Sequence, residues 1–176
     1  MNKNKLFLFI NGFSIYFYWW FCFWGASINK YYIGPSLAIA YFIFHFSKIG
    51  DKRKELKMML FCTIYGFILE SLFYYTDFID YKGILPQNLS IVPIWVLILW
   101  AGYALTVFHS FKWIYKKYLV SFLLGGFFAP LIYLSGNRIG CIILKYDIIT
   151  SYLVLFPVWS FSLLLLNYIS VIINEN

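Results

Sequence analysis

The sequence predicts an all-α membrane protein, a single domain (1–176) that forms a bundle of about six transmembrane helices. Hydrophobic residues make up 62% of the 176 residues and charged residues only 12%, about half of the charged share in a soluble domain. The apolar residues fall in runs long enough to cross a bilayer as helices. No run alternates polar and apolar residues as a strand of an outer-membrane barrel does.

The first three apolar runs are separated by short polar segments. The first run follows Lys3 and Lys5, and the second opens with Gly34-Pro35, where proline is tolerated in a first helical turn. The basic segment 48–57 separates the second run from the third. A polar connection from 76 to 90 then ends the third run.

The last three runs complete the expected bundle. A basic turn at 112–117 lies between the fourth and fifth runs, and a mixed connection at 135–147 precedes the sixth, where Pro157 is expected to bend the helix. The expected spans are residues 6–24, 31–47, 58–75, 90–111, 118–134 and 148–173.

The distribution of basic residues predicts the orientation. Most of the 14 Lys and Arg residues lie in the N-terminal segment, in segment 48–57 and in turn 112–117, all on one side of a six-helix bundle. Positive charge favours the cytoplasmic side, so both termini are expected in the cytoplasm and the chain in a bacterial inner membrane. The net charge of +7 is therefore attributed to topology and headgroup contacts, and no nucleic-acid partner is expected.

Two ionisable residues within the apolar runs are the candidate catalytic residues, because such groups are costly in a membrane and face the bundle interior. Glu70 is interpreted as a proton-carrying or ligand-binding carboxyl, or as a neutral group that hydrogen-bonds between helices for assembly. His109 would take a direct role, or bond to a neighbouring helix or to headgroups. His45 is interpreted as a residue of the membrane interface.

The helical rise separates these candidates into two layers. Glu70 would lie roughly 18 Å from the cytoplasmic end of its helix and His109 within about 5 Å of that end, so they are not expected to pair. Arg138 is expected at the outer interface, as a surface charge, a partner of Glu70 or an anion binder. The candidate ligand-binding residues are Tyr18, Tyr133 and Arg138 toward the Glu70 layer, Asn11 and Thr106 toward the His109 layer, and Trp95 on the face of Thr106 and His109.

No metal or cofactor site is predicted. Cys22, Cys62 and Cys141 are widely spaced and form no CxxC pair, so they are interpreted as small packing residues, with a Cys22–Cys141 disulfide as the alternative. The HEXXH, Walker A and GxSxG patterns do not occur. Whether the protein is an enzyme is left open.

Two motifs resemble the bacterial family called domain of unknown function 2878. They are Pro93-x-Trp95 with Leu99-Trp100, Ala104-x-Thr106-x-x-His109-Ser110 and Trp113, and Gly126-x-x-x-Pro130-Leu131-x-Tyr133-x-x-Gly136-x-Arg138-x-Gly140. The chain carries Glu70 where the family usually has Asp. The resemblance implies an inner-membrane protein without an assigned activity, and a gene neighbourhood of lipid-modifying enzymes that favours lipid chemistry.

The leading functional hypothesis is a lipid-associated protein that binds an acyl-chain substrate within the bundle or assists its modification. The expected partners are membrane lipids, with lipid-modifying enzymes or a second copy of the chain as further possibilities. A small proton-linked transporter that acts as an oligomer is one alternative, although the chain is short and shows no internal repeat. A membrane scaffold or assembly subunit is the other.

Overall fold

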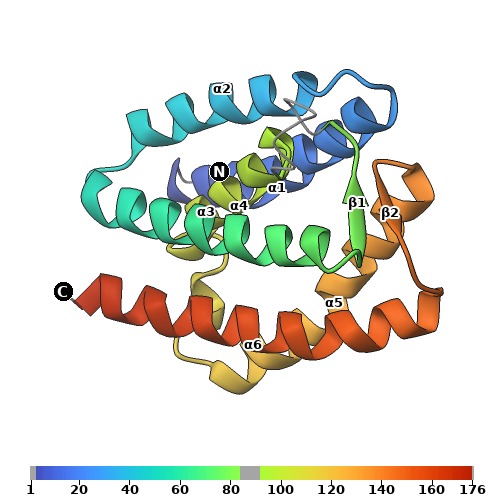
Figure 1. Cartoon of the computed structure of the whole chain (residues 1–176). Coiled ribbons are helices and arrows are strands. Elements are labelled where there is room, and N and C mark those ends of the chain that lie inside the picture. The colour runs from blue at the N-terminus through green and yellow to red at the C-terminus, as the bar shows by residue number, and fades with distance from the viewer. Residues whose placement is uncertain (1–2, 84–91, 176) are drawn as a thin grey trace.

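A computed structural model describes residues 3–83 and 92–175 as a bundle of six α-helices with one small sheet, which confirms a predominantly helical protein (Figure 1). The start of α1 and the end of α6 lie toward one end of the bundle, and β1 and β2 lie at the other. The elements are α1 (Lys3–Ser27), α2 (Ile33–Lys48), α3 (Lys52–Tyr75), β1 (Ile79–Tyr81), α4 (Ile94–Val107), the 3-10 turn η1 (Lys112–Ile114), α5 (Tyr118–Ile139), β2 (Ile142–Leu144) and α6 (Ile148–Glu175).

Four helices, α1, α3, α5 and α6, are long and apolar enough to cross a membrane. Helix α4 is apolar but has 14 residues, and α2 has 16. The outer surface is rich in large apolar side chains, which a water-soluble monomer rarely exposes over such an area. On α1 alone the exposed rings include Phe9, Phe13, Tyr16, Phe17 and Trp20.

Several helix boundaries differ from the expected spans, and two of them affect the position of candidate residues. Helix α3 begins at Lys52 instead of residue 58, because Asp51 caps it by accepting hydrogen bonds from the backbone N–H groups of Arg53 and Lys54. Part of the predicted basic loop is therefore the first turn of a helix. Helix α4 ends at Val107 rather than at residue 111, while residues 90 and 91 of the fourth predicted span lie outside the described residues.

The polar connection after the third run and the mixed connection before the sixth each contribute a strand to one β-pair. Strands β1 and β2 pair antiparallel, with Ile79 opposite Leu144 and Tyr81 opposite Ile142. Gly140 makes the turn into β2 possible, since it ends α5 with a φ of 82°, in the left-handed region that favours glycine. The sheet joins the segment after α3 to the segment after α5 at one end of the bundle.

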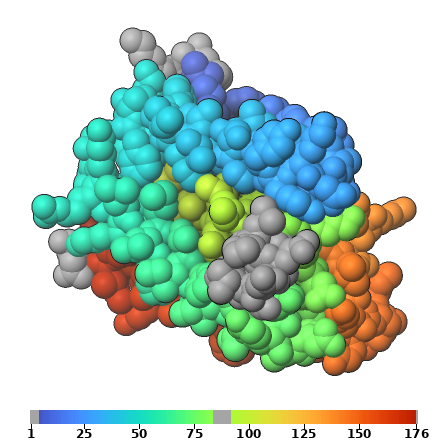
Figure 2. Space-filling view, turned by 45° about the horizontal axis from the view of Figure 1, so that its top comes forward, coloured from blue at the N-terminus to red at the C-terminus, as the bar shows by residue number. Residues whose placement is uncertain are grey.

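The helices pack closely where one of them carries glycine. Gly66 of α3 lies directly against the Trp100 indole of α4, and Gly102 of α4 against the Tyr18 ring of α1. Gly125 of α5 touches the backbone of Trp159 in α6, so it lies in a packing face, as the sequence suggested for its small residues. Figure 2 shows part of α4, in yellow-green, at the surface between α2 and α3.

Candidate functional site

Helix α3 carries two buried carboxyl groups, Glu55 in its first turn and Glu70 near its other end. Their separation of fifteen positions corresponds to about 22 Å along the helix axis. Each one is the centre of a separate group of polar side chains. These are called the Glu55 cluster (Asn11, Tyr41, His45, Glu55 and His109) and the Glu70 cluster (Glu70, Tyr81, Trp100 and Tyr133).

In the Glu70 cluster, three donors from three elements bind one carboxyl group. Tyr133 of α5 donates to Oε1 at 2.7 Å and the Trp100 indole of α4 donates to the same oxygen at 2.9 Å. The Tyr81 hydroxyl of β1 donates to Oε2. Burial raises the pKa of Tyr81 well above its usual value, so this residue is a neutral phenol able to donate. Both carboxyl oxygens of Glu70 therefore accept hydrogen bonds from the protein itself.

The Glu55 cluster brings together both histidines of the chain, His45 from the last turn of α2 and His109 from the turn after α4. His109 Nε2 lies 2.9 Å from Glu55 Oε1, and His45 Nε2 lies 3.6 Å from Glu55 Oε2. Glu55 and His45 are fully buried, whereas the His109 side chain keeps 19% of its surface exposed. Of the three residues in this contact, His109 is therefore the one that is partly exposed.

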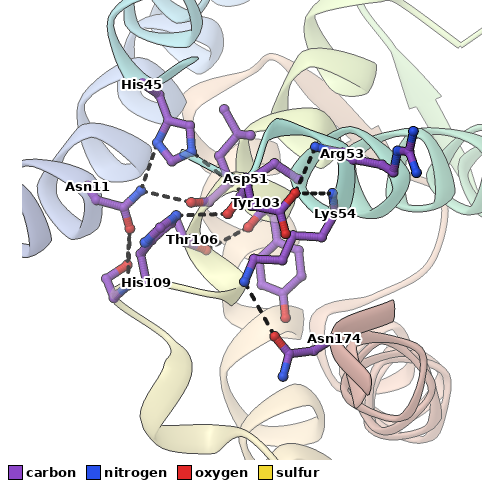
Figure 3. A network of polar contacts seen from close by, with 12 residues as sticks. Asn11, His45, Asp51, Arg53, Lys54, Tyr103, Thr106, His109 and Asn174 are labelled. Atoms are coloured by element: carbon purple, nitrogen blue, oxygen red, sulfur yellow. Dashed lines mark hydrogen bonds and ion pairs between the residues drawn. The ribbon is translucent and has the colours of Figure 1, made fainter. Parts of the chain in front are cut away.

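Asn11 of α1 holds the two histidine-bearing segments in place (Figure 3). Its amide oxygen accepts hydrogen bonds from the backbone N–H and the hydroxyl of Ser110, at 3.1 and 2.7 Å. Its amide nitrogen donates to Leu105 O and to the Tyr41 hydroxyl, both at 2.8 Å. The Tyr41 hydroxyl in turn lies 3.3 Å from His45 Nδ1. A single side chain therefore links α1 to α2 and to the turn that carries His109.

The immediate surroundings of the Glu55 cluster are both apolar and cationic. The Phe7 ring of α1 packs on both imidazoles, with centroid distances of 5.7 Å to His45 and 5.1 Å to His109. Lys54 precedes Glu55 in α3, and its Nζ lies 5.4 Å from the ring centroid of Phe108, the residue before His109. An apolar ring and a positive charge therefore lie near the turn that carries His109.

The remaining candidate ligand-binding residues belong to neither cluster; they are Tyr18, Trp95, Thr106 and Arg138. Thr106 is buried and donates to the carbonyl of Tyr103 in its own helix, and Trp95 donates to Lys82 O beyond β1. The Tyr18 hydroxyl is buried with no hydrogen-bond partner in the described part of the chain. Arg138 is exposed near the end of α5, and the groups that bind Glu70 are Tyr81, Tyr133 and Trp100.

The three cysteines are buried free thiols, so the alternative of a Cys22–Cys141 disulfide is not present in this structure. Cys141 donates to Gly136 O at 3.3 Å at the turn between α5 and β2. Burial raises the pKa of the Cys141 thiol to about 12, so it remains protonated at neutral pH. This agrees with the interpretation of the cysteines as packing residues.

Sequence reasoning missed Glu55 because it placed this residue in a basic loop. It also assigned His45 to the membrane interface, whereas the His45 side chain is fully buried against Asn11, Tyr41 and Glu55. One signal was available. The segment from Lys52 to Leu56 consists of strong helix formers after an aspartate that can cap a helix, which predicts Glu55 on a helix rather than in a loop.

The fold and the two clusters define a class: a helical protein with membrane-compatible helices and two buried carboxyl centres. Over residues 8–165 the chain matches the family model described as "Protein of unknown function (DUF2878)". The protein belongs to this family, which confirms the resemblance seen in the sequence motifs. Neither a curated protein nor a solved structure gives a significant match to the chain.

Proposed function

We propose that this protein is a six-span inner-membrane protein with both termini in the cytoplasm, and that it binds a lipid or assists its modification at the Glu55 cluster. The observation that carries the proposal is the pairing of the buried Glu55 with the partly exposed His109 at 2.9 Å, next to the Phe7 ring. A polar centre that opens beside an apolar ring is suited to an amphiphile whose headgroup and acyl chain need different surroundings.

The proposed roles follow from position. His109 is the residue that a headgroup meets first, because it is the partly exposed one of the two histidines that contact Glu55. Glu55 orients its imidazole through the hydrogen bond to Nε2. Lys54 supplies a positive charge that attracts an anionic headgroup, and Phe7 contacts the first part of the acyl chain.

The Glu70 cluster is assigned a structural role in this proposal. Three donors already occupy the two oxygens of Glu70, and its side chain is 3% exposed. A proton-linked transporter would require this carboxyl to exchange protons with water. A carboxyl enclosed by neutral donors from three elements is better suited to hold those elements together.

A comparative lipidome tests the proposal. Cells with the wild-type protein are compared with cells that lack it and with cells that carry Glu55→Gln, His109→Ala or Glu70→Gln at matched membrane abundance. We expect one lipid class to change on deletion, Glu55→Gln and His109→Ala to reproduce the change, and Glu70→Gln to resemble wild type. An unchanged lipidome after deletion would contradict the proposal.

A further inference from the structure

His45, Glu55 and His109 offer three potential metal ligands in a very small volume. One nitrogen from each imidazole and one oxygen from the carboxylate all lie within 4.8 Å of one another. Two ligand atoms that each lie about 2.1 Å from one metal ion are about 3–3.4 Å apart. His109 Nε2 lies 2.9 Å from Oε1, in a hydrogen bond that a bound metal ion would replace, and His45 Nε2 lies 3.6 Å from Oε2. Both separations are close to this value.

Two buried atoms of this group lack the partners that buried polar atoms normally have. His45 Nε2 and Glu55 Oε2 have no hydrogen-bond partner among residues 3–83 and 92–175. They lie 3.6 Å apart, close enough for an ion pair if the imidazole is protonated but too far for a hydrogen bond. Leaving such atoms unpaired costs free energy, and a buried carboxylate needs a compensating positive charge. One cation between the two atoms meets both needs.

The residues behind the ligands orient them for this purpose. The Tyr41 hydroxyl lies 3.3 Å from His45 Nδ1 and can accept a hydrogen bond from Nδ1–H. In this tautomer Nε2 carries no proton, and its lone pair is directed at Glu55. Asn11 donates a hydrogen bond to the Tyr41 hydroxyl at 2.8 Å. It also accepts one from the Ser110 hydroxyl, in the turn that carries His109. Metal-bound histidines in proteins characteristically have such a partner on the second ring nitrogen.

We infer that His45, Glu55 and His109 bind a divalent transition-metal ion of the Zn²⁺ or Fe²⁺ kind. Two imidazole nitrogens and one carboxylate oxygen suit these ions, whereas Mg²⁺ and Ca²⁺ prefer oxygen ligands alone. Three protein ligands leave at least one coordination position free for water or a substrate oxygen. The exposed side of His109 gives that position its access. The inference goes beyond the proposed lipid function and does not depend on it.

Metal binding by the purified protein tests the inference directly. The full chain is purified in detergent through an affinity tag without histidine and stripped with a chelator. Zn²⁺ is then titrated in competition with a chromophoric chelator, and the metal content is measured by mass spectrometry. We expect one ion per chain and a loss of affinity of at least about 100-fold for His45→Ala, His109→Ala or Glu55→Gln. Tyr41→Phe, which keeps all three ligands, should lose about tenfold.

Two controls separate this site from adventitious binding. A variant with all three cysteines changed to serine removes the thiols, and Glu70→Gln changes the other buried carboxyl of α3; both should bind one ion as wild type does. Co²⁺ in the wild-type protein should give the visible absorption bands of a nitrogen- and oxygen-ligated ion, which needs no variant to fold. Absence of stoichiometric binding by wild type, or equal binding by Glu55→Gln, would overturn the inference. Because no lipid is present, this result is independent of the lipidome.

Discussion

Glu55 and Glu70 lie on the same helix and are both nearly inaccessible to solvent, yet their surroundings differ. Glu70 accepts hydrogen bonds from three neutral donors on β1, α4 and α5. Glu55 faces two imidazoles, and one of its oxygens has no hydrogen-bond partner in the described residues. A carboxyl whose oxygens are all used stabilises the fold. A carboxyl with one oxygen that accepts no hydrogen bond, beside an imidazole nitrogen that makes none, is suited to bind a ligand or an ion.

Removal of the Glu70 carboxyl should have the largest effect on stability. Glu70→Ala leaves the buried donors of Tyr81, Trp100 and Tyr133 without an acceptor, and each such loss costs about 1–3 kcal/mol. We expect a destabilisation of at least about 3 kcal/mol, measured by thermal unfolding of the detergent-purified protein followed by tryptophan fluorescence. Glu70→Gln, which keeps one acceptor oxygen, should lie between Glu70→Ala and wild type.

The equivalent change at the other carboxyl should have a much smaller effect. In the presence of a chelator, Glu55→Gln should change stability by about 1 kcal/mol or less. The amide oxygen still accepts from His109, and the amide nitrogen can donate to the unpaired Nε2 of His45. The same unfolding assay compares the two glutamines. If Glu55→Gln unfolds as early as Glu70→Gln, the contrast between the two clusters is wrong.

Zn²⁺ sharpens this comparison, because only one of the two clusters is expected to bind it. At a free concentration of about 100 times its Kd, Zn²⁺ should stabilise the wild-type protein by about 2.7 kcal/mol. Glu70→Gln should gain the same increment from its lower starting point, whereas Glu55→Gln should gain none. Unfolding temperatures with and without Zn²⁺ give the answer. A Zn²⁺ response that survives in Glu55→Gln would contradict the assignment of the ligands.

The smallest effect should come from the exposed ion pair near the sheet. Asp80 of β1 lies 2.5 Å from Lys145 and raises the pKa of that lysine. A raised pKa in the folded state means that the pair stabilises the fold at neutral pH and that this contribution is lost as the pH rises through the raised pKa of Lys145. The Lys145→Ala protein should therefore unfold slightly below the wild-type temperature at pH 7. Once the pH exceeds the raised pKa of Lys145, the two unfolding temperatures should be equal. A large loss at pH 7 would show that the pair matters more than exposed pairs normally do.

Much of the helical framework could be predicted from the sequence, since apolar runs of membrane length mark helices whatever their neighbours. The β1–β2 pair could not, because three-residue strands carry no periodic signal and their partners are more than sixty residues apart. The rise per residue placed Tyr133 at the depth of Glu70, and the two are hydrogen-bonded. The same estimate placed the helical turn that contains Trp100 at this depth, but depth alone does not tell which side chains meet. Trp100 was therefore not identified as a partner, and neither was Tyr81.

The metal-ligand group illustrates the same limit more strongly. His45, Glu55 and His109 come from three separate segments, and no fixed spacing along the chain connects them. Glu55 was in addition hidden among basic residues that look like a loop when read by charge. Helix propensity and the helix cap at Asp51 predict that Glu55 lies in a helix, but they do not predict its partners. Only the packing of α2, α3 and α4 brings the histidines to the carboxylate.

The positions of these partners along the chain also set an order of events during synthesis. All members of the Glu55 cluster have been synthesised once residue 109 has been added to the chain, whereas Tyr133, a partner of Glu70, is added 63 residues after it. At bacterial and eukaryotic elongation speeds this interval is roughly 3–13 s. During that time the third helix holds a carboxyl without one of its final hydrogen-bond donors. The end of the bundle with the histidines is therefore the part that can mature first, and the end with the sheet closes last.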